Sequence, residues 1–363
     1  MTTTAVHRKV NFSAGPAVLP ESVLQEAREN ILSFGSTGIG VLEQSHRGKS
    51  FVSILEKAEA DLRELLGLDA NWDVMFLSGG ATTQFFQVPM NFMKGGVANY
   101  HDTGVWSDKA IKEAKRFGTV HVASSSKNEK YTHIPKSYNY AENGIYTHFT
   151  SNNTIYGTQY RVEPKSPALL VCDASSDILS RPVDIDKYAI IYGGAQKNIG
   201  PAGVTVVVMR KDWTEKGDEN LPSILQYRNH AANQSCFNTP PCFPIYVASL
   251  VFQWIKDQGG LKAMQKHNED KAAVLYNFLD ANNGFFTVPV TNKEDRSLMN
   301  VVFRTPSEEL DNKLVKDAER EGFDGLKGHR SAGGLRASIY NAMSKENIQA
   351  LVDYMGTWVK ANG

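Results

Sequence analysis

A single lysine, Lys197, stands between an apolar run and a glycine- and proline-rich turn in the stretch YAIIYGGAQKNIGPAG, residues 188–203. A lysine beside a turn is usually a hydrated surface charge. Here the run AII predicts a buried strand, and the two glycines after it allow a backbone or a flat ligand to approach closely. Burial lowers the pKa of an amine and frees the lone pair that a nucleophile or a Schiff base needs. Lys197 is therefore a candidate catalytic residue.

An aspartate, Asp173, ends a second apolar run in ALLVCDASSDILSRP, upstream of the lysine. Taken alone, it could equally cap a helix or a turn. About one βαβ unit separates it from Lys197, and the pair suits pyridoxal phosphate, which needs a lysine to hold its aldehyde as an imine and an acid beside its ring nitrogen. Because side chains alternate along a strand, Cys172 points away from the Asp173 face and is predicted to belong to the core.

Two further stretches could serve the same cofactor. In FLSGGATTQFFQ, a predicted strand and two glycines precede a helix that begins near Ala81 and Thr82, where free backbone N–H groups can bind a phosphate. In DTGVW, Trp106 could stack on a flat ring or belong to the core. The sequence contains no HExxH, GxSxG, P-loop or EF-hand motif, which favours metal-free chemistry on an organic cofactor.

The elements around these residues alternate between strand and helix. Helical spacing occurs in residues 21–34 and 51–68, and short buried strands are predicted at 73–77, 96–100, 119–124, 168–175, 188–194 and 203–211. Such alternation favours a largely parallel sheet covered by helices, in which ligands bind beyond the carboxyl ends of the strands. Asp173 and Lys197 both lie at such ends.

The remainder of the chain has a different texture. An irregular stretch rich in Asn, Pro and Ser, residues 221–250, is expected to be functional or to form an interface. From about residue 263, a long polar helix, short strands and a final helix predict a separate α+β domain, with one helix start in TPSE capped by Thr305. The expected domains are 18–262 and 263–363, with residues 1–17 packing near the smaller one.

Composition argues against several classes of protein. The 363 residues carry 39 basic and 39 acidic side chains with no basic tail, so nucleic acid and anionic membranes are not expected as partners. No stretch suits a signal peptide or a membrane span, and the three cysteines, Cys172, Cys236 and Cys242, form no CxxC or zinc-type pattern. These features predict a cytoplasmic protein without a metal site.

Seven motifs, in order along nearly the whole chain, resemble the phosphoserine aminotransferase family of pyridoxal-phosphate enzymes, within the class-V aminotransferases: NFSAGPAVLP, SHRGKSF, CDASSDILSRP, GGAQKNIGPAG, FNTPP, LKGHR and GLRASIYNA. The resemblance implies the aspartate aminotransferase-like fold (fold type I). In this α/β fold, a large domain holds a mostly parallel seven-stranded sheet covered by helices, and a smaller C-terminal α+β domain follows. The resemblance also implies a homodimer with shared active sites.

The resemblance assigns a role to each matching residue. Lys197 would bind the cofactor covalently and shuttle a proton, and Asp173 would pair with the pyridinium nitrogen. The other cofactor-binding residues would be Trp106 against the ring, Thr154 near the phenolic oxygen, and a phosphate-binding set of Ala81, Thr82, Gln196 and, from the other subunit, Asn238 and Thr239. The substrate-binding residues would be Arg336 for the α-carboxylate and, for the distal anion, His329, Arg330 and, from the other subunit, His46 and Arg47.

The reaction implied by the resemblance transfers the amino group of L-glutamate to 3-phosphohydroxypyruvate, giving O-phospho-L-serine and 2-oxoglutarate for serine biosynthesis. A role in vitamin B6 synthesis stays open. One alternative is another aminotransferase of the same fold, such as an alanine–glyoxylate type. A sulfur-removing lyase would need a reactive cysteine, and none of the three lies in a matching motif. A nucleotide-binding or scaffold protein without chemistry would not need both Asp173 and Lys197.

Overall fold

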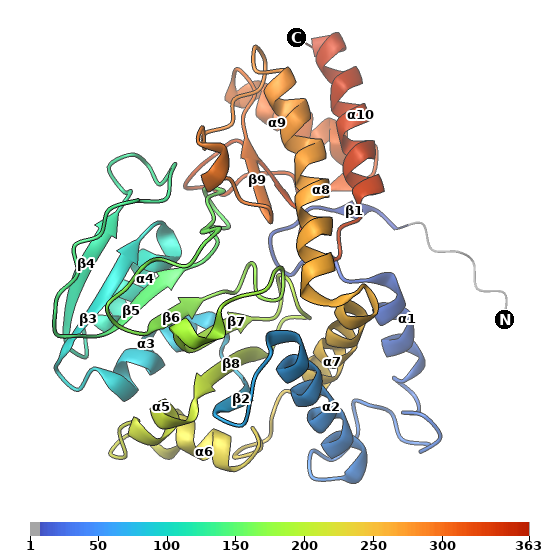
Figure 1. The fold of residues 1–363 in the computed structure, drawn as a ribbon. Coiled ribbons are helices and arrows are strands. Elements are labelled where there is room, and N and C mark those ends of the chain that lie inside the picture. The colour runs from blue at the N-terminus through green and yellow to red at the C-terminus, as the bar shows by residue number, and fades with distance from the viewer. Residues whose placement is uncertain (1–7, 363) are drawn as a thin grey trace.

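A seven-stranded sheet forms the centre of the larger part of the molecule (Figure 1). The computed structural model describes residues 8–362. The strand order is β2-β8-β7-β6-β5-β3-β4, and every strand is parallel to the others except β8, which is antiparallel to both of its neighbours. The predicted mostly parallel, seven-stranded sheet is confirmed. The strands are β2 (Trp72–Leu77), β3 (Val97–Asp102), β4 (Thr119–Ser125), β5 (Gly144–Thr150), β6 (Leu170–Asp173), β7 (Tyr188–Gly194) and β8 (Thr205–Arg210).

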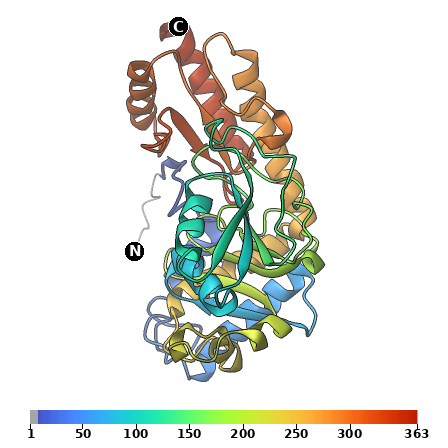
Figure 2. The ribbon, with the colours of Figure 1, turned by 90° about the vertical axis from the view of Figure 1, so that its left-hand side faces the viewer.

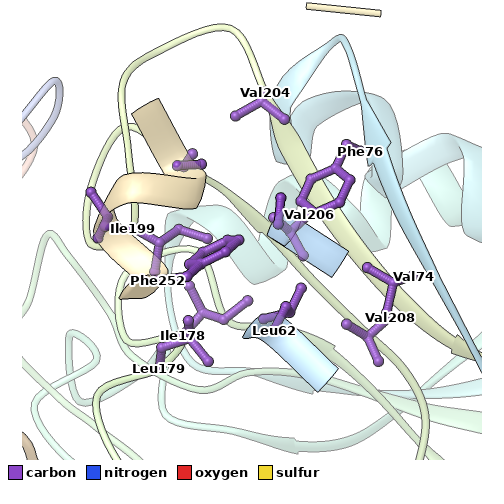
Figure 3. Close-up of a cluster of buried hydrophobic side chains, with 14 of the residues drawn as sticks. Leu62, Val74, Phe76, Ile178, Leu179, Ile199, Val204, Val206, Val208 and Phe252 are labelled. Carbon is purple, nitrogen blue, oxygen red and sulfur yellow. The ribbon is translucent and has the colours of Figure 1, made fainter. Parts of the chain in front are cut away.

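Helices cover both faces of this sheet. On one face, Leu62 of α2 and Phe252 of α7 pack with Val206 of β8, and Figure 3 shows this cluster. Val207, the next residue of β8, belongs to the core under α3 and α4 on the other face, because successive strand side chains point in opposite directions. The helices of this part are α1 (Glu21–Glu29), α2 (Lys49–Leu66), α3 (Gly80–Phe92), α4 (Val105–Ala114), α5 (Lys211–Lys216), α6 (Tyr227–Ala232) and α7 (Cys242–Asp257). Among residues 8–362, no helix is both long and apolar enough to span a bilayer.

A second hydrophobic core lies in the C-terminal part, which stands above the sheet in Figure 1. Strands β9 and β11 pair antiparallel, and β1 (Val10–Asn11) pairs parallel with β10. Phe12 then enters this core from the N-terminal segment. Figures 1 and 2 both show α8 running from the level of the sheet into the C-terminal part. The elements here are α8 (Gly260–Ala281), β9 (Asn300–Phe303), α9 (Glu308–Arg320), β10 (Phe323–Asp324), β11 (Leu335–Ser338) and α10 (Lys345–Asn362).

The predicted domain boundary, between residues 262 and 263, falls in the first turn of α8. The division into 18–262 and 263–363 stays a prediction, which the separate hydrophobic clusters of the two parts support. Residues 1–17 were expected near the smaller domain. Of these, residues 1–7 lie outside the described residues, and the parallel pairing of β1 with β10 supports the expectation for the rest.

Two local features differ from the sequence-based expectation. The apolar pattern does not predict β5, because the polar residues Thr147 and His148 interrupt it, although both are buried in the structure. The prediction that Thr305 caps α9 is wrong. Ser307 is the capping residue, because its extended backbone places its hydroxyl to accept a backbone N–H from the first turn of α9.

Candidate active site

A cavity of about 470 Å³ opens at the carboxyl ends of the parallel strands. Asp173 ends β6, and Lys197 follows β7 in the next turn. This is the edge of the sheet at which the sequence predicts the chemistry. The cavity is lined by Ala14, Gly15, Gly79, Gly80, Ala81, Thr82, Phe85, Trp106, Thr154, Ile155, Asp173, Ser175, Gln196, Lys197, His329 and Arg336.

Lys197 faces this cavity and is half-buried. Its Nζ donates a hydrogen bond to Thr154 Oγ1 at 2.6 Å and lies 5.3 Å from the centre of the Trp106 ring. Burial lowers the pKa of Lys197 from its ordinary 10.5 to about 8. The negative charge of Asp173 opposes this shift, and the positive charge of Arg336 adds to it. Near neutral pH, more of this amine is therefore unprotonated than in water, as a nucleophile requires.

Asp173 is only 4% exposed. Its Oδ1 accepts two hydrogen bonds from Ser175, from the backbone N–H at 3.1 Å and from the hydroxyl at 2.6 Å. The same hydroxyl oxygen accepts the N–H of Gly194, at the end of β7, at 3.1 Å. Burial raises the pKa of Asp173, while the Ser175 hydroxyl and the charge of Lys197 oppose that rise. A buried carboxylate held in this way suits a positively charged partner inside the cavity.

A glycine turn connects β2 to α3 and brings the start of that helix to the cavity. Gly79 and Gly80 have φ angles of 100° and 70°, in the left-handed region that favours glycine. A Cβ at Gly79 would meet Thr83 Oγ1 at 2.0 Å, so no side chain fits there. Ala81 and Thr82 form the first turn of α3 and line the cavity. Because a helix start presents free N–H groups, this end of the cavity suits a phosphate.

Two further predicted cofactor-binding residues, Trp106 and Gln196, also line the cavity. Trp106 lies in the first turn of α4, and its indole Nε1 is buried without a hydrogen-bond partner among the described residues. Since a buried donor without a partner destabilises a fold, this N–H suits a polar atom of a bound group. The backbone oxygen of Gln196 accepts the N–H of Ala17, which fixes the turn just before the lysine.

Arg336 reaches the cavity from β11 in the C-terminal part. One of its terminal nitrogens donates to the backbone oxygen of Thr154 at 3.3 Å, and its Nε is buried without a partner within residues 8–362. His329 lies in the loop before β11, and its Nδ1 is 2.7 Å from Ser331 Oγ. A guanidinium group with free N–H donors can bind a carboxylate through two parallel hydrogen bonds.

The predicted site residues that do not line this cavity are Arg330, Asn238, Thr239, His46 and Arg47. Arg330, Asn238 and Thr239 are exposed. His46 and Arg47 line a separate cavity of about 260 Å³. All except Arg330 were expected to act in a neighbouring subunit, and one chain alone leaves that prediction untested.

Some cavity residues escape sequence reasoning: Gly15, Phe85, Ile155 and Ser175. A signal for Ser175 exists, since an aspartate often accepts the N–H of the residue two positions later. At Gly15 the backbone passes close to the lysine, because a Cβ at this position would lie 3.1 Å from Cγ of Lys197. Phe85 and Ile155 resemble any other core residues and carry no signal of their own.

Together these residues fit pyridoxal phosphate. The cavity combines an amine with a lowered pKa, a buried carboxylate, a helix start and an indole ring. Those groups match the aldehyde, the ring nitrogen, the phosphate and the ring face of the cofactor. In the described part of the chain, no three His, Cys, Asp or Glu side chains gather as a metal site would require.

Comparison with known proteins gives a consistent result. Residues 9–351 match the family model described as aminotransferase class V. The phosphoserine aminotransferase of Herpetosiphon aurantiacus is 46% identical over 97% of this chain and 99% of its own. The solved phosphoserine aminotransferase from Bacillus circulans subsp. alkalophilus superimposes with a TM-score of 0.96, at 46% identity over 98% of this chain and 99% of that one. A PLP-bound phosphoserine aminotransferase from Trichomonas vaginalis gives a TM-score of 0.90, at 36% identity over 96% and 100%.

The fold, the cavity and the family model together define a class-V aminotransferase. The chain belongs to the phosphoserine aminotransferase family, because the similarity to its members extends over almost the full length of both sequences. The resemblance carried by the seven sequence motifs is therefore confirmed.

Proposed function

We propose that this chain is a pyridoxal-phosphate-dependent enzyme that transfers the amino group of L-glutamate to 3-phosphohydroxypyruvate, giving O-phospho-L-serine and 2-oxoglutarate. The convergence of Lys197, Asp173 and Arg336 on one cavity carries this proposal. An aminotransferase needs an available amine, an acid for the cofactor ring and a guanidinium for the substrate α-carboxylate. Identities of 46% and 48% to phosphoserine aminotransferases favour this substrate within the class.

Pyridoxal phosphate, when bound, supplies an electron sink that stabilises negative charge at the substrate Cα. Lys197 would hold it covalently, and the buried Asp173 would pair with its ring nitrogen. The other residues that would contact it line the same cavity: Ala81, Thr82, Trp106, Thr154 and Gln196. Asn238 and Thr239 of a second subunit would complete the phosphate site.

Lys197 would also transfer the proton during the reaction. Because burial lowers its pKa to about 8, a larger fraction of the amine is unprotonated near neutral pH than in water, and in that form its Nζ would take a proton from the substrate Cα. The hydroxyl of Thr154, 2.6 Å from Nζ, orients the amine. Proton transfer requires such a fixed position, since the base must stay within hydrogen-bond reach of the carbon that loses the proton.

Substrate binding would depend on positive side chains at two places. Arg336 would hold the α-carboxylate with its free N–H donors. His329 and Arg330 would hold the distal anion, which is a phosphate in one substrate and a γ-carboxylate in the other. His46 and Arg47 of a second subunit would join them. The Nδ1 of His329 accepts a backbone N–H at 3.2 Å, so in the neutral ring Nε2 carries the proton and can donate to an anion.

A homodimer is part of the proposal. The segment between α1 and α2 exposes several apolar side chains, including Leu32 at 84%, Leu42 at 58% and Ile39 at 48%. Apolar groups exposed in one segment favour burial against another protein surface. His46 and Arg47 lie near the end of this same segment, just before α2. A second copy that packed here would bring them toward a neighbouring active site.

The proposed enzyme is cytoplasmic and belongs to serine biosynthesis. It follows a ping-pong mechanism, in which glutamate first donates its amino group and the keto acid then accepts it. An alanine–glyoxylate aminotransferase is less supported. Relatives that are 46% and 49% identical over almost the whole chain are phosphoserine aminotransferases.

An assay of the purified, cofactor-loaded protein tests this function. With glutamate and 3-phosphohydroxypyruvate, we expect phosphoserine and 2-oxoglutarate to form in equal amounts. With alanine and glyoxylate, we expect little or no product. Turnover of the second pair without the first would assign the chain to the alternative.

A further inference from the structure

Lys109 lies on α4, one turn after Trp106, and the sequence motifs give it no role. Its Nζ is 4.5 Å from the centre of the Trp106 ring. The Lys109 side chain is exposed, whereas Trp106 lines the cavity. Helical side chains lean toward the N-terminus of their helix, and α4 begins beside the cavity. Lys109 does not line the cavity itself, but its contact with Trp106 places its ammonium beside the cavity wall.

In the described part of the chain, this ammonium has no acidic partner. The adjacent carboxylate, Asp108, pairs instead with Lys112 at 2.6 Å and with Lys127 at 3.6 Å. Across residues 8–362, Lys109 forms no ion pair with a carboxylate, and the acid nearest to it in sequence is engaged by two other lysines. A lysine that contacts only a ring and water is available to an anionic ligand.

The charge of Lys109 acts on His329, a basic residue that lines the cavity, together with the charges of Arg330 and Arg336. Burial lowers the pKa of His329, and the positive charges of Arg336, Arg330 and Lys109 lower it further. Like Lys109, Arg330 and Arg336 pair with no carboxylate in the described part of the chain, and Arg336 Nε is buried without a partner. We call these four residues the cationic rim. The positive charges of the rim repel one another, and a bound anion offsets this repulsion. The rim therefore stabilises an anion bound among its side chains.

We propose that Lys109 is a specificity-determining residue, whose ammonium helps to bind the phosphate of 3-phosphohydroxypyruvate and O-phosphoserine. This inference rests on the proposed function. A phosphate monoester carries nearly two negative charges near neutral pH, whereas the side chain of glutamate carries one. An additional positive charge beside the cavity wall therefore favours the phosphorylated substrate. A lysine supplies that charge on a flexible stem, so it can follow anions of different length.

Replacing Lys109 by methionine tests the charge separately from the packing, since Lys109→Met keeps an unbranched side chain against Trp106. We expect kcat/KM for 3-phosphohydroxypyruvate to fall about three- to tenfold, as for an exposed charge that faces a dianion. The glutamate half-reaction should lose less, and Lys109→Arg should keep most of the activity. The matched control is Lys112→Met on the same helix, whose partner is Asp108 and which should retain both half-reactions.

Inhibition by inorganic phosphate gives a second readout. Phosphate should compete with 3-phosphohydroxypyruvate less well in Lys109→Met by a similar factor, and the difference should shrink at high ionic strength. Equal losses in both half-reactions, or unchanged phosphate inhibition, would show that Lys109 only supports Trp106 and would overturn the inference. The unmodified enzyme separates the two proposals. Failure to convert 3-phosphohydroxypyruvate refutes the proposed function, whereas conversion that Lys109→Met leaves unchanged refutes only the role of Lys109.

Discussion

Compared with the cationic rim, the inner wall of the cavity is far more constrained. The inner wall, which we define as Thr154, Asp173, Ser175 and Lys197, follows the carboxyl ends of neighbouring strands. Side-chain hydrogen bonds of 2.6 Å connect Lys197 with Thr154 and Ser175 with Asp173, and the backbone N–H of Ser175 donates a further bond to Asp173 at 3.1 Å. The rim comes from α4, from β11 and from the loop before it, and no ion pair within the described residues holds it. In the proposed function, the sheet thus fixes where the chemistry occurs, and the rim would decide which anion is accepted.

The largest expected effect comes from breaking the inner wall at Lys197. Within residues 8–362, no second lysine lines the cavity, so Lys197→Met should lower kcat by at least about a thousandfold through loss of the covalent amine and the base. Steady-state kinetics measure this directly. Lys187→Met, before the other end of β7, removes ion pairs with Asp184 at 3.1 Å and with Glu163 at 3.8 Å. Lys187 does not line the cavity, so this control should leave the rate unchanged. A loss below tenfold in Lys197→Met would mean that the inner wall is not the reactive region.

A smaller and selective effect is expected at the rim. A charge-assisted hydrogen bond contributes about 1.5–3 kcal/mol, so Arg330→Leu should lower kcat/KM for 3-phosphohydroxypyruvate about ten- to a hundredfold. The glutamate half-reaction should lose less, because glutamate has one negative charge on its side chain. The cofactor absorbance should stay intact. Stopped-flow measurement of each half-reaction separates the two substrates. Equal losses would give Arg330 a purely structural role, and a larger loss for glutamate would indicate a dicarboxylate enzyme.

A further test asks whether the site is completed by a second chain. Asn238 and Thr239 are exposed and lie outside the cavity of their own chain. If they complete a neighbouring phosphate site, the double replacement by alanine should weaken cofactor binding by roughly ten- to a hundredfold, since two hydrogen bonds of about 0.5–1.5 kcal/mol each are lost. Titration of cofactor-free protein measures this affinity, and sedimentation checks the oligomer. Asn220→Ala serves as the control. Unchanged affinity with an intact dimer would show that the loop serves another purpose.

The smallest expected effect is on stability and tests the environment of the inner wall. Burial lowers the pKa of Lys197 to about 8 in the folded chain, below the 10.5 of the exposed amine. Between these values the unfolded chain binds a proton that the folded chain does not, so this lysine makes stability rise with pH. Below about pH 8 the lysine is charged in both states, so the folded chain bears the full free-energy cost of burying that charge. Cofactor-free Lys197→Met should therefore have a Tm a few degrees above that of the unmodified protein at pH 7. Each kcal/mol gained in the free energy of unfolding raises Tm by roughly 2–4 °C.

That gain should shrink as the pH rises from about 8 toward 10.5, where the lysine of the unmodified protein becomes neutral in both states. Differential scanning calorimetry of both proteins over this range gives the comparison. Groups common to both proteins cancel in the difference. A gap in Tm that stays constant with pH would mean that Lys197 is not desolvated.

Most of the sheet could be predicted from the sequence, because its central strands are short apolar runs bounded by turns. Strand β5 could not, since His148 and Thr147 are polar and lie inside it. His148 Nε2 is 2.8 Å from the hydroxyl of Tyr192, and the hydroxyl of Thr147 accepts from Ser166 at 2.7 Å. These partners are distant in sequence, so no local pattern indicates that the polar groups can be buried.

The residues of the site also divide into those that the sequence predicts and those that it does not. Lys197 and Asp173 could be inferred from their positions after buried strands, and a short-range turn pattern could have found Ser175. The rim has no comparable signal. Lys109 is an exposed lysine like many others, and it becomes informative only because folding places it near His329, from a distant part of the chain. The roles proposed for Asn238 and Thr239 would depend on a second chain, whose position no single sequence pattern specifies.

Chemical reduction of the loaded protein tests the central claim, that Lys197 is the amine at the centre of this site. Borohydride should fix pyridoxal phosphate to the protein, and mass spectrometry of the digest should find the added mass on the peptide that contains Lys197. Lys197→Met should take up no label under the same conditions. A label on any other lysine, or no label at all on the unmodified protein, would contradict the account.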